Sequence, residues 1–230
     1  MLFNKEDSPA HIVTIFPQAS DLFTEYNINF CCDGEHPLER QCLEQGVNVE
    51  TLLDELNERY AIWKRHGYTT TDWEEVPLSQ IVEQIIEYHH YFKQELVNLE
   101  RFVLRVNDVH GHTQPHLQRL EKLYETFKTA LEAHIELEES ELFPAVKQLT
   151  SSRTESVEIK IKELNKRLTT HHQTLIEMYN EIKKVTHNFE APLHACATYH
   201  VMYDRLADLY IDVLQYIHLE HGIFFKKVMN

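Results

Sequence analysis

Apolar residues recur every three or four positions in four long stretches of the chain, at about residues 78–107, 115–149, 154–187 and 193–228. This spacing places the apolar side chains on one face of a helix, which packs against its neighbours. Only short connections separate the four stretches, so each helix is expected to run opposite to the one before it. The pattern therefore predicts an antiparallel four-helix bundle over residues 77–230.

The first part of the chain, residues 1–66, is patterned as several short helices. Ser8 before a proline is typical of a helix start, Gly46 of a helix end, and Asn48 of the next start. The stretch 66–77 shows no periodicity and is predicted to be a linker. Only five Gly and seven Pro occur in 230 residues, which favours long helices over a turn-rich β fold. The fold is therefore predicted to be all-α, with a small N-terminal helical domain before the bundle.

Polar residues interrupt the apolar stripe of every long helix. They are His89 in the first, His134 and Glu138 in the second, His171 or His172 in the third, and Tyr216 and Glu220 in the fourth. Residues four apart point to the same side of a helix. His89 lies about 18 residues before the end of its helix and His134 about 18 after the start of the next. The two are therefore expected to meet at one height in an up-down pair.

Inward-facing imidazoles and carboxylates at one level of a bundle are typical of di-iron carboxylate sites. Mixed nitrogen and oxygen ligands suit iron or manganese better than thiophilic metals. A single His and Glu four apart is usually only a solvated pair, and a lone core histidine is usually hydrogen-bonded. The coincidence over four helices favours the metal, because buried His and Glu are costly unless paired or bound. Periodicity alone leaves open His89 or His90, and His171 or His172.

The charge balance excludes some partners. Lys and Arg number 22 against 37 Asp and Glu, a net charge of −15, which disfavours nucleic acid and anionic membrane surfaces. No apolar run approaches the roughly 20 residues of a membrane span, and no basic-then-apolar leader opens the sequence, so a cytoplasmic location is expected. The cysteines, Cys31, Cys32, Cys42 and Cys196, form no CxxC pair and are expected to be thiols there.

Two groups of motifs resemble a known family. The stretch LEESELFP after His134, and Ile-His-Leu-Glu ending at Glu220, are similar to the two halves of a hemerythrin-like domain. The stretch Phe-Cys-Cys-Asp-Gly at 30–34, followed by Cys42, resembles the small N-terminal domain of the iron–sulfur cluster repair di-iron proteins. These are the YtfE/ScdA type, also called repair-of-iron-centres proteins. The resemblance covers nearly the whole chain.

The resemblance implies two iron ions, with ligands His89, His134, Glu138, His172 and Glu220. Glu138 and Glu220 would bridge the irons. The family normally has His four residues before its final Glu, where this chain has Tyr216, and His218 lies about 200° around the helix from it, so it does not replace the missing ligand.

The same resemblance assigns Cys31 and Cys32 a role in redox chemistry or iron transfer. The alternative for this pair is that small buried thiols only fill a core.

The function implied is repair of iron–sulfur clusters damaged by oxidative or nitrosative stress. The di-iron centre would bind NO or O2, donate iron, or do both, and damaged or apo iron–sulfur proteins would be the partners. Two alternatives stay open: an O2 or NO binding or sensing protein without a repair role, and an interaction module that has lost its metal. Whether the protein is an enzyme, and whether it is a monomer or a homodimer, is left open by the sequence.

Overall fold

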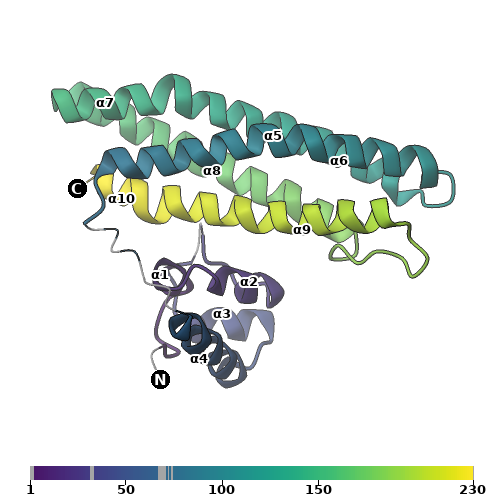
Figure 1. Ribbon diagram of the computed structural model, residues 1–230. Helices are drawn as coiled ribbons and strands as arrows, with labels where there is room; N and C mark the ends of the chain where they lie inside the picture. Colours follow the sequence, from purple (N-terminus) through teal and green to yellow (C-terminus); the bar gives the residue numbers. More distant parts are fainter. Residues whose placement is uncertain (1–2, 32–33, 67–70, 72, 74, 230) are drawn as a thin grey trace. The chain divides into compact units, whose positions relative to one another are not determined.

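The computed structural model describes residues 3–31, 34–66, 71, 73 and 75–229 (Figure 1). Every regular element in this part of the chain is a helix, so the all-α prediction is confirmed. The chain divides into two compact units, one made of Met1–Ile81 with Val213–Asn230 and the other of Val82–Asp212. None of the described helices combines the length and the apolar character that a membrane span requires.

The unit Val82–Asp212 contains all or most of four long helices that run alongside one another, two of which extend past its bounds. They are α5 (Leu78–His110), α6 (His116–Leu137), α8 (Glu155–Val185) and α9 (Ala197–His218). Buried hydrogen bonds join them: the Tyr124 hydroxyl of α6 donates to the Leu96 carbonyl of α5 over 2.8 Å. The Tyr179 hydroxyl of α8 donates to the Leu206 carbonyl of α9 over 2.9 Å. Successive helices reverse direction, as the bundle prediction requires.

The apolar stripes form the core of this unit. All stripe residues of α5 after Leu78 are buried, namely Ile81, Ile85, Phe92, Leu96, Leu99, Val103 and Val106. Between α6 and α8, the rings of Phe127 and Tyr179 meet edge to face with centroids 4.6 Å apart. Full burial of each large apolar side chain contributes roughly 1.5–3 kcal/mol, so the stripes hold the helices in register.

The second predicted helix, 115–149, is not continuous. After α6 the chain forms a π-helical segment, η1 (Glu138–Leu142), and then α7 (Phe143–Ser151). Pro144, at the start of α7, has no N–H to donate to the carbonyl four residues earlier and its ring crowds that carbonyl, which favours a break in the α-helical pattern here. The prediction of one uninterrupted helix was therefore wrong at the level of the candidate site.

The fourth predicted helix, 193–228, differs in two ways. It begins at Ala197, because Pro192 to Ala195 form a turn in which the Ala195 N–H donates to the Pro192 carbonyl. Its end is also interrupted, since α9 passes into a second π-helical segment, η2 (Leu219–Phe224), followed by α10 (Phe225–Met229). The third predicted helix, 154–187, ends at Val185 with Thr186 as its C-cap, and the next three residues, 187–189, adopt left-handed backbone conformations.

The other unit contains the short helices α1 (Pro9–Ile15), α2 (Ala19–Glu25), α3 (Leu38–Gln45) and α4 (Val49–Arg65). Their predicted ends are confirmed. The Ser8 hydroxyl accepts from the His11 N–H, the Asn48 side chain accepts from Glu50 and Thr51, and Gly46 is left-handed with φ 68°. Much of the predicted linker 66–77 lies outside the described residues.

Candidate metal centre

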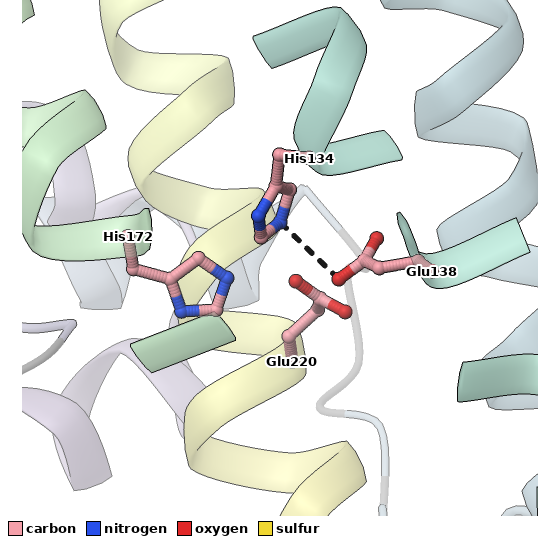
Figure 2. Close-up of side chains that lie close together, drawn as sticks. All are labelled: His134, Glu138, His172 and Glu220. Carbon is pink, nitrogen blue, oxygen red and sulfur yellow. Dashed lines mark ion pairs between the residues drawn. The ribbon is translucent and has the colours of Figure 1, made fainter. Parts of the chain in front are cut away.

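Four buried side chains point toward one another in Figure 2: His134, Glu138, His172 and Glu220. One ligand atom from each lies within 4.8 Å of the corresponding atoms of the other three. All four side chains have no exposed surface. Two carboxylates and two imidazoles removed from water need a compensating partner, and a metal cation supplies one.

Both carboxylates come from the π-helical segments. Glu138 is the first residue of η1 and Glu220 the second residue of η2. Single π-turns inside α-helices occur frequently at functional sites. His134 lies in the last turn of α6, four residues before Glu138. Its Nε2 lies 3.2 Å from the Glu138 Oε1. The ring of His172 lies 4.8 Å from that of His134, centroid to centroid.

His89 reaches the same carboxylate from α5. Its ring is fully buried, and its Nε2 lies 2.9 Å from the second oxygen, Oε2, of Glu138. Glu138 therefore meets His134 with one oxygen and His89 with the other. The prediction that His89 and His134 lie at one height is confirmed by these contacts.

The structure also separates the neighbouring histidines. His90 is exposed on α5 whereas His89 is buried, and His171 is partly exposed on α8 whereas His172 is buried. The interior positions are thus the two that the resemblance favoured.

Comparisons with known proteins agree with this geometry. Residues 80–228 match the model of the hemerythrin HHE cation binding domain. The chain belongs to the hemerythrin family.

Residues 5–60 of this hemerythrin-family chain match a second model, the ScdA N-terminal domain, described as a domain of unknown function (DUF542). The iron-sulfur cluster repair protein ScdA of Staphylococcus epidermidis is 29% identical over 99% of this chain and 100% of its own length. The iron-sulfur cluster repair protein YtfE of Shigella boydii serotype 4 is 30% identical over 93% of this chain and 92% of its own. The resemblance inferred from the sequence motifs is therefore confirmed.

Tyr216 lies on α9, four residues before Glu220, at the position where the resemblance led us to expect a histidine. Its side chain is fully buried. Asp212, one turn earlier again, accepts a hydrogen bond of 2.7 Å from the Tyr91 hydroxyl at the surface. Tyr216 is thus an interior residue, while Asp212 is engaged by an exposed phenol.

Glu139 and Lys93 belong to the surroundings of this hemerythrin-family site, although their sequence pattern did not single them out. Glu139 Oε1 lies 3.0 Å from the Nδ1 of His89, and Lys93 Nζ lies 2.8 and 2.9 Å from the two Glu139 oxygens. Partial burial opposes ionisation of the Glu139 carboxyl, but hydrogen bonds from Lys93 and His89 outweigh it and lower its pKa. The one feature of the sequence that points to Lys93 is its spacing, because it follows His89 by four residues and so lies on the same side of the helix.

Of the predicted cysteine pair, Cys31 is buried between α2 and α3, and Cys32 lies outside the described residues. The Cys31 N–H donates to the Asn29 side-chain oxygen over 3.1 Å, and its Sγ lies 3.5 Å from the same atom. Cys42 is buried in α3, where burial raises the pKa of its thiol. Cys196 is an exposed thiol.

Proposed function

We propose that this hemerythrin-family protein binds two iron ions and supports the repair of damaged iron–sulfur clusters. The observation that carries the proposal is the buried cluster of His134, Glu138, His172 and Glu220. Repair is the activity named for relatives that match the chain over nearly its full length.

The ligands would be the five interior side chains His89, His134, Glu138, His172 and Glu220. Glu138 would hold iron through both of its oxygens, which face different imidazoles, His89 and His134. Glu220 would be the second carboxylate ligand of the cluster. Bound iron would supply one-electron redox chemistry and affinity for small gases such as NO or O2.

The donor chemistry fits such a pair of cations. Two carboxylates carry negative charge into a region without solvent contact, and neutral imidazoles add nitrogen ligands without adding charge. Among the described residues no cysteine joins this cluster, and a nitrogen and oxygen set favours iron or manganese over thiophilic metals. The overall charge of −15 also favours cation uptake.

The N-terminal part would serve the transfer of iron to the damaged cluster. We divide the chain into a ScdA-type domain, residues 1–66, and a hemerythrin-like bundle, residues 77–230. Cys31 and Cys32 would exchange iron or electrons with the acceptor, since thiolates bind iron and undergo redox reactions. Damaged or apo iron–sulfur proteins are the partners, and the cytoplasm, which keeps thiols reduced, is the location.

The test combines metal analysis with a repair assay. Protein purified without chelators from iron-rich medium should carry about two irons per chain. It should restore activity to a [4Fe–4S] hydratase that has been inactivated by nitric oxide, and the Glu138→Ala variant should not. An exposed-site variant, His112→Ala, is the matched control and should repair as well as the wild type. Protein that carries one zinc and no iron, or that holds iron without repair, would contradict the proposal.

A further inference from the structure

We propose that Glu139 is a positioning residue that fixes the ring of His89 for metal binding, with Lys93 holding Glu139 from the surface. The inference rests on the proposed metal site and goes beyond it to a residue outside the ligand set. It starts from the contacts of the two ring nitrogens of His89. The His89 Nε2 faces Glu138 at 2.9 Å, and its Nδ1 faces Glu139 at 3.0 Å.

The Glu139 carboxylate lies beside the Nδ1 of His89, and the Glu138 carboxylate lies beside its Nε2. A metal bound on the side of Glu138 would take the lone pair of Nε2, which leaves the ring proton on Nδ1. That Nδ1–H would then donate to the Glu139 carboxylate, which only accepts hydrogen bonds when ionised. Histidines that bind metals usually donate their other ring N–H to a carboxylate or carbonyl, which fixes the ring and raises its basicity.

The protein holds Glu139 in this position through a charged contact. Lys93 follows His89 by one turn on α5, so both side chains lie on the same face and meet Glu139 together. The Lys93 ammonium contacts both carboxylate oxygens, at 2.8 and 2.9 Å. Charge-assisted hydrogen bonds of this kind are shorter and stronger than neutral ones.

The arrangement connects a buried ring to the protein surface. The His89 side chain is fully buried, whereas Glu139 is 38% and Lys93 46% exposed. Glu138 and Glu139 are consecutive in η1, and the first is fully buried whereas the second is partly exposed. An iron held through His89 would therefore be less firmly bound whenever Glu139 is drawn away.

Iron release measures this role directly. Iron-loaded Glu139→Ala protein should lose iron to a chelator about 10- to 100-fold faster than wild type, the usual effect of removing the orienting partner of a metal-bound histidine. Lys93→Met should have a smaller effect in the same direction, because Glu139 remains. Glu141→Ala, at a partly exposed carboxylate of the same segment that pairs with Arg167 rather than with His89, is the matched control and should behave as wild type. Wild-type release from Glu139→Ala would overturn the proposal.

A second measurement requires no metal and separates this proposal from the proposed function. In iron-free protein with ¹⁵N-labelled histidine, NMR should show the His89 Nδ1 protonated, and Glu139→Ala should shift that resonance while Glu141→Ala leaves it. An unprotonated Nδ1 in the wild type would overturn the positioning role. If the NMR result is as expected but the wild type binds no iron, the orienting contact stands and the iron function fails.

Discussion

The Nδ1 atom of His218 lies 3.1 Å from the carbonyl oxygen of Phe30, the residue immediately before Cys31. The carbonyl only accepts, so Nδ1 donates, and the other nitrogen lies 3.2 Å from the Thr14 hydroxyl. Burial of the ring lowers the pKa of His218 to about 4, so the ring is neutral at pH 7. This histidine attaches the end of α9 to the segment that carries the predicted cysteine pair.

Replacing His218 by Leu should therefore destabilise the protein. The change leaves the Phe30 carbonyl without this donor in a buried place, which costs roughly 1–3 kcal/mol. Gly222→Ala should act in the same direction, because an added Cβ would lie 3.1 Å from the His218 ring and force it to move. The measurement is the free energy of unfolding in urea, made on iron-free protein since bound metal adds its own stabilisation. Unchanged stability in both variants, with His200→Leu as an exposed control, would contradict the role of this contact.

The candidate ligands can be tested against histidines elsewhere on the bundle. His134→Ala and Glu138→Ala should each remove most of the bound metal, because either change opens a fully buried site and leaves its partners uncompensated. His187→Ala, at an exposed position, should retain the metal. Iron content per chain is the measurement. Equal loss from all three variants would mean that the inward-facing assignment is wrong.

The sequence predicted this inward-facing set because burial and ligation share one periodic signal. An interruption of an apolar stripe by His or Glu is visible without a structure, and His134, Glu138 and Glu220 were found in that way. Choosing His89 over His90 was not possible from spacing alone, since neighbouring residues differ by only about 100° around the helix. The structure makes the choice through burial.

Two features of the site have no comparable signal. The π-helical segments that carry Glu138 and Glu220 break the 3.6-residue period locally. Only η1 is followed by a Phe-Pro pair, directly after Leu142, and η2 has no such mark in the sequence. Glu139 is partly exposed and adjacent to a ligand, so its pattern is that of an ordinary surface carboxylate. Its role depends on a contact with a helix 46 positions away, at Lys93, which only the fold reveals.

Cys31 and Cys32 should be separable from metal binding. The double variant Cys31→Ser with Cys32→Ser should keep the visible absorption of a bridged ferric pair, because Cys31 is outside the buried ligand cluster. It should be impaired in restoring a nitric-oxide-damaged [4Fe–4S] hydratase. Cys42→Ser provides the comparison, since Cys42 is a buried thiol of α3. Repair at the wild-type rate by the double variant would mean that the two cysteines only fill space in the core.

The bundle should lose stability in mild acid through His116. Its Nε2 lies 2.9 Å from the Tyr199 hydroxyl and 3.1 Å from that of Tyr203. Burial, and then the nearby His187, lower the pKa of His116 below its usual value of about 6.5. The unfolded chain therefore binds this proton more readily, so the contribution is present above about pH 6.5 and is lost as the pH falls below it.

The corresponding variant is His116→Gln, which retains a polar group but does not titrate. Its melting temperature should fall less than that of the wild type between pH 7 and pH 5, with the iron removed from both. His112→Gln, at an exposed position, should follow the wild type. A wild-type pH dependence in His116→Gln would assign the acid sensitivity to other groups.

Tyr216 distinguishes two forms of the proposed di-iron site. Either its phenolate binds iron, since a metal's charge can depress a phenol pKa that is ordinarily about 10, or the ring only packs beside the site and one iron lacks a ligand. We favour packing, because Tyr124 and Tyr179 are fully buried in the same core and their hydroxyls donate to backbone carbonyls. Tyr216→Phe should then leave the iron content and the visible spectrum unchanged. Tyr216→His should slow iron loss to a chelator, because it supplies the imidazole that the family motif has at this position. A ferric phenolate would instead give a strong visible charge-transfer band, and loss of both that band and one iron in Tyr216→Phe would establish the tyrosine as a ligand.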